Sequence, residues 1–195
     1  MKNENTVFSD KKVLSLQELK NNGYTQYKIK KLVDEGKLIK LNKSYYENAE
    51  YKGEESDFYY LKAYAPQSVV CLLSAAVFHN LSTYIPEGID IAIPRKAKIS
   101  SMPSWPQINL HYFTDERYSL GVMVVEDGDN VFQIYDKEKT VVDIVFYREI
   151  IGIEETKEVL LNYLNEKQRN LNKLLEYAKL MKCEKVMRNY LEVLI

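Results

Sequence analysis

The amino-acid sequence predicts an α+β fold, in which a small helical module with a β-ribbon precedes a mixed sheet domain and a C-terminal helical bundle. Three observations predict this order. Residues 13–47 show two short helical patterns, a turn and two strand patterns. Apolar runs between residues 89 and 135 indicate strands, and from residue 136 onward apolar residues recur at helical spacing. We expect two domains, 1–50 and 57–195, because the segment between them is charged and contains a glycine.

The second helix of the N-terminal module has signals at both ends. We expect it over residues 24–35, with Thr25 as N-cap, because the threonine hydroxyl can accept a hydrogen bond from a first-turn N–H group. Gly36 follows, at the place where a helix often ends on a residue in the left-handed conformation. A stripe of apolar residues at i, i+3 and i+4 faces the expected core: Ile29, Leu32 and Val33.

The flanking segments complete the module. The apolar face of a shorter first helix is formed by Leu14, Leu16 and Leu19. Asn22-Gly23 supplies the turn between the two helices. After the second helix, residues 38–41 and 45–46 read as strands around Asn42-Lys43-Ser44. This is the order of a winged helix-turn-helix, in which the second helix enters the major groove of DNA.

Charge is unevenly distributed along the chain. The whole sequence has a formal net charge of −1, but between Asp10 and Tyr45 nine lysines stand against four acidic residues, which leaves +5. Cations gathered on a small module are the electrostatic footprint of a phosphate-binding surface. The alternative is that these lysines form an ordinary solvated helix face. They are Lys11, Lys12, Lys20, Lys28, Lys30, Lys31, Lys37, Lys40 and Lys43.

The residues expected to contact DNA lie on the second helix and on the ribbon. Gln26 is the candidate for reading a base edge, because a glutamine amide can pair bidentately with adenine. The lysines are expected to hold phosphates and to fix the register without reading sequence. With about six phosphate contacts, affinity should fall about a thousandfold between roughly 50 and 200 mM salt. The candidates are Thr25, Gln26, Tyr27, Lys28, Lys30, Lys31, Lys40, Lys43 and Ser44.

The second domain begins with helical patterns. A short helix ends at Pro66, and the apolar run 69–80 is long enough for a buried helix with Ser68 as its N-cap. Cys71 within this run reads as a small buried hydrophobic residue. Strands are expected over 89–93, 108–113, 121–125 and 131–135, the last two as a hairpin. Later helices are expected from a cap at Asp136 and over 154–164, 170–182 and 184–194.

Two polar residues in apolar surroundings each have two interpretations. His79 is either a catalytic or ligand histidine or, as we favour, a cationic cap on helix-end carbonyls. Asp143 is either a catalytic carboxylate or, as we favour, a buried one that pairs with an arginine such as Arg148 or caps a neighbour.

Several function classes find no support in the sequence. It contains no G-x-G-x-x-G, P-loop or H-E-x-x-H motif and no nucleophile-elbow serine, so we expect no enzyme, no cofactor and no metal. Cys71 and Cys183 are too few and too isolated for a disulfide framework or a metal cluster. The N-terminus has no apolar signal-peptide core, and no run approaches about 18 apolar residues. We therefore expect a cytoplasmic protein without a membrane partner.

Four stretches, in their order and spacing, resemble the AbiEi family of antitoxins from type IV toxin–antitoxin and abortive-infection operons. They are YTQYKIKKLVDEGKLIKLNKSYY, then LLSAAVFHNL followed by IPEGIDIAIPR, then YDKEKTVVDIV, and finally NLNKLLEYAKLMKCEKVMRNYLEVL. Together these stretches span most of the chain. One departure is Asn80 after His79, where relatives often carry glycine.

The resemblance implies a two-domain cytoplasmic protein. Its winged helix would bind inverted repeats of operator DNA in its own promoter and repress the operon, with room for two copies to bind cooperatively. Its C-terminal domain would counteract a nucleotidyltransferase-like toxin without a stable complex. Two alternatives stay open. One is a winged-helix regulator that senses a ligand, and the other is a DNA-tethered enzyme that needs Asp90, Asp143 or His79 for turnover. A second basic surface, with a role on DNA or in antitoxicity, would comprise Lys96, Lys98, Lys167, Arg169 and Lys173.

Overall fold

The computed structural model describes residues 11–99 and 101–194, and the chain divides into two compact units. The first unit holds the chain up to Gln67 together with Ile99–Pro106 and Val124–Phe132. The second unit holds Ser68–Lys98, Gln107–Met123 and the chain from Gln133 onward. Both units combine helices with a sheet, so the expected mixed α+β class is confirmed. The domain boundaries inferred from the sequence stay a prediction, and the first ten residues of the expected domain 1–50 lie outside the described residues.

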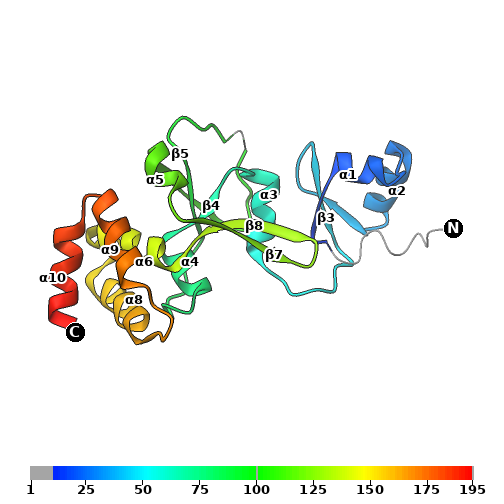
Figure 1. Cartoon of the computed structure of the whole chain (residues 1–195). Helices are drawn as coiled ribbons and strands as arrows, with labels where there is room; N and C mark the ends of the chain where they lie inside the picture. The colour runs from blue at the N-terminus through cyan, green and yellow to red at the C-terminus, as the bar shows by residue number, and fades with distance from the viewer. Residues whose placement is uncertain (1–10, 100, 195) are drawn as a thin grey trace. The chain divides into compact units, whose positions relative to one another are not determined.

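In the first unit, two helices pack on a small antiparallel sheet with the strand order β1-β3-β2 (Figure 1). The elements are β1 (Val13–Ser15), α1 (Leu16–Asn21), α2 (Gln26–Asp34), β2 (Leu38–Lys40) and β3 (Tyr45–Asn48). One buried cluster draws a residue from each of them: Leu14, Leu19, Ile29, Leu38 and Tyr46. The helices are therefore fixed to the sheet by a continuous apolar core.

The start of α1 differs from the expectation. Leu14 was expected on the first helix, but it lies on β1 and pairs with Tyr46 of β3. Ser15 is the reason: its Oγ accepts from the Glu18 backbone N–H (3.1 Å), and the Glu18 carboxylate accepts from the Ser15 N–H (2.7 Å). This reciprocal capping box begins the helix at Leu16 and leaves the residues before it free to pair as a strand.

Helix α2 spans Gln26–Asp34, slightly less than the expected 24–35, and has the predicted residues at both ends. The Thr25 hydroxyl accepts from the Lys28 backbone N–H at 3.3 Å, which confirms the N-cap. At the other end Gly36 has φ 72° and donates to the Val33 carbonyl, while the next N–H, of Lys37, donates to the Leu32 carbonyl. These two bonds form a Schellman motif, which satisfies the last carbonyls and turns the chain into β2.

Glu18 gives a prediction for stability against pH. Burial by itself raises the pKa of this carboxyl, but hydrogen bonds from Lys11, Ser15 and Lys62 lower it from 4.5 to about 2. Glu18 therefore stabilises the fold above pH 4.5, and this contribution is lost as pH falls toward 2. Because its side chain is 32% exposed, we discount the effect for solvent screening.

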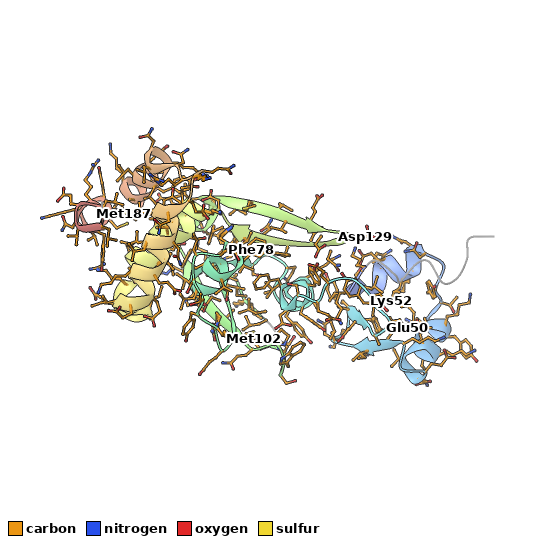
Figure 2. The ribbon with its side chains drawn as sticks, turned by 90° about the horizontal axis from the view of Figure 1, so that it is seen from below. Glu50, Lys52, Phe78, Met102, Asp129 and Met187 are labelled. Atoms are coloured by element: carbon orange, nitrogen blue, oxygen red, sulfur yellow. The ribbon has the colours of Figure 1, made fainter. Side chains whose placement is uncertain are left out.

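We expect Glu18→Gln to lower the free energy of unfolding by about 1–2 kcal/mol at pH 7. The difference from the native protein should shrink between pH 4.5 and 2 in urea titrations followed by circular dichroism. Glu50→Gln is the matched control, because Glu50 is an exposed acid on the same unit (Figure 2). A pH-independent difference for Glu18→Gln would show that the capping box is not held by charge.

The first unit also contains segments from later in the chain. After η1 (Asp57–Tyr60) and α3 (Leu61–Tyr64), it includes the tip of the hairpin formed by β7 (Val122–Asp127) and β8 (Asn130–Tyr135), where Asp129 lies (Figure 2). The buried Asn130 side chain accepts from the Lys12 backbone N–H at 2.8 Å and donates to the Tyr51 hydroxyl at 3.0 Å. These bonds attach the hairpin tip to the start of β1.

The second unit is built on a five-stranded mixed sheet with the order β6-β5-β4-β8-β7. Its other strands are β4 (Val69–Val70), β5 (Ile89–Pro94) and β6 (Ile108–Phe113), with β5 parallel to β6 and antiparallel to β4. Met187, labelled in Figure 2, is fully buried in the hydrophobic core of the second unit. The helices are α4 (Leu72–Phe78), α5 (Asp115–Ser119), α6 (Lys137–Phe146), α7 (Arg148–Ile151), α8 (Ile153–Asn165), α9 (Leu171–Leu180) and α10 (Glu184–Leu194).

The apolar run 69–80 is not one helix. Val69 and Val70 form β4, because Val70 pairs with Ile91 on one side and Ile134 on the other. The helix begins only at Leu72, so its N-cap is Cys71 and not Ser68. Cys71 is fully buried, as expected.

Candidate nucleic-acid interface

All nine residues expected to contact DNA are exposed. Tyr27, in the first turn of α2, is the most accessible large side chain among them, with 78% of its surface exposed. Ile29, in the same turn, is buried, so α2 turns one face to the core and the opposite face to solvent.

A groove of about 340 Å³ runs between α2 and the strands β2 and β3. Gln26 and Lys30 line it from the helix, and Lys40 and Lys43 line it from the ribbon. Its apolar part is supplied by Leu16, Ile29, Val33 and Tyr46. The fold thus brings one amide and three ammonium groups, from two separate segments, to one concave surface.

Lys28 and Lys31 do not line this groove. At about 100° of rotation per residue, Lys28 lies on the opposite side of α2 from Gln26 and Lys30. Lys31 lies between these positions, with its ammonium 3.7 Å from the Glu35 carboxylate. The candidate cations of α2 are therefore spread over its exposed half, and Lys30 is the one that faces the ribbon.

The turn between β2 and β3 is held by Asn42, whose role was not recognised in the sequence. Its side-chain oxygen accepts from the backbone N–H groups of Ser44 (2.9 Å) and Tyr45 (3.0 Å). Its side-chain amide donates to the Ala63 carbonyl at 2.8 Å. An asparagine in an Asx turn was the available signal. These bonds fix the turn that carries Lys43.

Ion pairs neutralise some of the nine lysines that were counted between Asp10 and Tyr45. Lys12 is 7% exposed and pairs with Glu47 (3.2 Å) and Glu55 (2.8 Å), so it belongs to the interior. Lys11 pairs with Glu18 at 2.5 Å. Within residues 11–99 and 101–194, no carboxylate comes within 4.0 Å of the ammonium groups that line the groove. Lys30, Lys40 and Lys43, which we call the groove lysines, thus carry unneutralised charge, as does the exposed Lys20 outside the groove.

His79 is buried at the end of α4, and its partner is not the one expected. Its Nε2 donates to the carbonyl of Tyr135 on β8 at 2.7 Å, and not to the last carbonyls of its own helix. Burial lowers the pKa of the imidazole despite this bond, which favours the neutral ring over the expected cation. The histidine thus joins α4 to the sheet.

Asp143 is a fully buried carboxylate, as favoured, but Arg148 is not its partner. Its Oδ2 lies 2.5 Å from the Lys139 ammonium, and its Oδ1 lies 3.5 Å from the Arg117 guanidinium. Arg148 pairs with Glu149 instead. The Arg117 guanidinium stacks 4.0 Å from the Phe146 ring centroid, which covers this charged group with aromatic surface.

Asp90, the third residue considered for catalysis, is also held by neighbours. Its Oδ1 accepts from His111 Nε2 at 3.0 Å and from the Asn109 side chain at 3.3 Å. Its backbone N–H donates to the Ser74 hydroxyl. In the part of the chain that the structure describes, no group of three or more His, Cys, Asp or Glu side chains is arranged to hold a metal ion. Over the same residues, no helix combines the length and hydrophobicity needed to cross a membrane.

Comparisons with known proteins do not assign this chain to a family. No family model and no curated protein matches this sequence. A similar solved structure is the crystal structure of the RV2827C protein from Mycobacterium tuberculosis, with 15% sequence identity and a TM-score of 0.44. The match covers 92% of this chain and 75% of that one. The function is therefore inferred from the residues themselves.

Proposed function

We propose that the first unit is a winged helix-turn-helix that binds duplex DNA through the groove between α2 and the β2–β3 ribbon. In this proposal α2 enters the major groove, and Gln26 reads a base edge while the groove lysines contact phosphates on either side of it. Thr25, Tyr27, Lys31 and Ser44 would lie at the margin of this contact surface. Lys28, which was expected to face the DNA together with Gln26, falls outside it because it lies on the opposite side of α2.

The observation that carries the proposal is the convergence of Gln26 with three unneutralised lysines. A merely solvated helix face requires no cations from the ribbon, but Lys40 and Lys43 face the same hollow as Lys30. A duplex carries phosphates on both sides of its groove. An amide that reads a base, with cations from two elements on either side of it, fits this arrangement of charges.

Together with the resemblance to AbiEi antitoxins, this surface supports a specific role. We propose that the protein represses its own operon through inverted repeats and opposes a nucleotidyltransferase-like toxin without a stable complex. The second unit would carry the antitoxin activity.

Gln26→Ala separates base reading from phosphate binding. We expect its affinity for operator to fall by about 1–3 kcal/mol, roughly 5- to 150-fold, while its affinity for a random duplex changes little. Gel-shift titrations with both duplexes at one salt concentration measure this. An equal loss of affinity for both duplexes would show that Gln26 does not read a base.

The antitoxin role is tested by co-expression of the whole chain with the product of the neighbouring downstream reading frame. The whole chain is required, because Ile99–Pro106 and Val124–Phe132 belong to the first unit. A variant with all three groove lysines changed to alanine, expressed from an independent promoter, should still suppress toxicity but should no longer repress its own promoter. Loss of suppression in a folded variant would contradict the division of roles.

A further inference from the structure

A basic turn follows β5 in the second unit. The Ala97 backbone N–H donates to the Pro94 carbonyl at 2.8 Å, so Arg95 and Lys96 occupy the two central positions of a β-turn. The Arg95 N–H donates to the Phe113 carbonyl at 2.9 Å, which ties the turn to the end of β6. Lys98 follows directly. We call Arg95, Lys96 and Lys98 the basic turn.

The charge of the basic turn is not neutralised locally. All three side chains are exposed, and no carboxylate of the described residues comes within 4.0 Å of them, although Asp115 and Glu116 begin α5 just beyond β6. Seven other cations of the second unit form ion pairs: Arg117, Lys137, Lys139, Arg148, Lys157, Lys173 and Arg188. Among the described residues, Lys167, Arg169, Lys179, Lys182 and Lys185 do not, but none of them belongs to a turn with two other cations. What distinguishes the basic turn is that three exposed cations without such partners lie within residues 95–98, and positive charge gathered in this way attracts an anionic ligand.

An exposed aromatic ring accompanies the basic turn. Tyr112 of β6 is directly opposite Ile93, two residues before Arg95, and 55% of it is exposed. Its neighbour Phe113 is buried in the core of the unit, so Tyr112 points to the other face of the sheet. The strand register and the Arg95–Phe113 bond therefore place Tyr112 and the basic turn at the same end of the β5–β6 pair.

We propose that the basic turn and Tyr112 bind a single strand of nucleic acid, with phosphates on the cations and one unpaired base stacked on the tyrosine ring. Cations that follow a backbone, with aromatic rings that accept bases, are the two components of single-strand binding sites. A duplex fits less well, because its base faces are covered and this β-turn offers no helix or ribbon to insert into a groove. This surface consists of residues of the second unit and shares none with the proposed duplex site.

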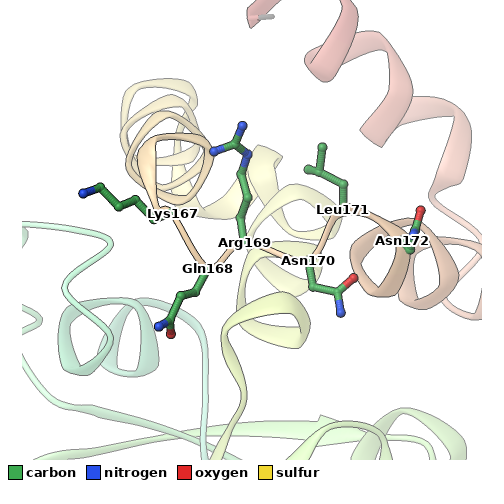
Figure 3. A pocket seen from close by; sticks show the side chains of 6 residues that line it. All are labelled: Lys167, Gln168, Arg169, Asn170, Leu171 and Asn172. Atoms are coloured by element: carbon green, nitrogen blue, oxygen red, sulfur yellow. The ribbon is translucent and has the colours of Figure 1, made fainter.

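A second open hollow, of about 530 Å³, lies at the connection between α8 and α9. Lys167 and Arg169 are exposed there, but Figure 3 shows Lys167, Gln168 and Arg169 pointing in different directions. The third cation expected in this region, Lys173, is held by Asp136 and Glu138, each at 3.1 Å. Lys167 and Arg169, which are exposed and form no ion pair among the described residues, therefore supply two of the three positions of a control for the basic turn.

The test measures fluorescence anisotropy of the full chain with a labelled 12-nucleotide oligo(dT) and with a random duplex. Changing the basic turn to alanine should weaken oligo(dT) binding about 100-fold at roughly 0.1 M salt. Tyr112→Ala should weaken it about 5- to 150-fold, and Tyr112→Phe should retain it. The control changes Lys167, Arg169 and Lys185, also one arginine and two lysines, and should leave oligo(dT) binding unchanged.

The alanine variant of the groove lysines distinguishes this proposal from the proposed function. It should lose duplex binding and keep oligo(dT) binding, whereas the basic-turn variant should do the reverse. Failure of the wild-type chain to bind oligo(dT), an equal loss in the control, or a basic-turn variant that loses only duplex binding would each overturn the single-strand site. Circular dichroism establishes that every variant is folded.

Discussion

Asp143→Ala is expected to lower the free energy of unfolding by about 3–5 kcal/mol, because it leaves a buried ammonium without its counter-charge. The side chains of Asp143 and Lys139 are both 0% exposed. Burial raises the pKa of the carboxyl and lowers that of the ammonium, and the attraction between them opposes both shifts. The Lys139 ammonium also lies 4.1 Å from the Tyr135 ring centroid, so an aromatic ring covers part of it.

Urea denaturation followed by far-UV circular dichroism measures this loss. The decisive comparison is the double variant Lys139→Met with Asp143→Leu, which replaces the ion pair by apolar groups of similar size. It should recover most of the stability, because a buried pair is costly to break but contributes little net stability. A loss below about 1 kcal/mol for Asp143→Ala would mean that the carboxylate is not what holds Lys139 in the interior.

Changing the three groove lysines to alanine is expected to weaken binding to any duplex by roughly 100- to 500-fold at about 0.1 M salt. Each lysine that releases a counterion contributes about 0.9 to the slope of log affinity against log salt, so three account for a change of about 2.7. The variant should unfold like the native protein, because Lys30, Lys40 and Lys43 are exposed. The matched control changes Lys20, Lys37 and Lys52, which are exposed lysines of the same unit outside the groove.

The elements that the sequence predicted well are those with local signals. Helix α2 is bounded by Thr25 and Gly36, whose effects act within four residues of the helix ends. The short strands β1 and β4 were missed, because their existence depends on distant partners. Leu14 pairs with Tyr46, and Val70 pairs with Ile134, 64 residues later in the chain. A strand of two or three residues has too little periodicity of its own to be recognised.

The candidate site shows the same difference between local signals, which the sequence contains, and long-range contacts, which it does not reveal. Residue types predicted which side chains suit DNA, but not which of them converge. Lys12 and Lys30 look alike in the sequence, yet one is buried against Glu47 and Glu55 and the other lines the groove. Likewise, Asp143 was expected to pair with Arg148, but its nearest partner is Lys139 on the same helix, and the arginine that approaches it is Arg117, 26 residues away on another element. Long-range pairing of charges is set by the fold and has no local signature.

The salt dependence of duplex affinity tests the central claim most directly. For the wild-type chain, log affinity for a random duplex plotted against log salt should have a slope of about −5, and the alanine variant of the groove lysines should have a slope of about −2 to −3. The control triple should keep the wild-type slope. A wild-type slope near zero, or one that the control triple reduces as much as the groove triple does, would contradict a duplex bound between α2 and its ribbon.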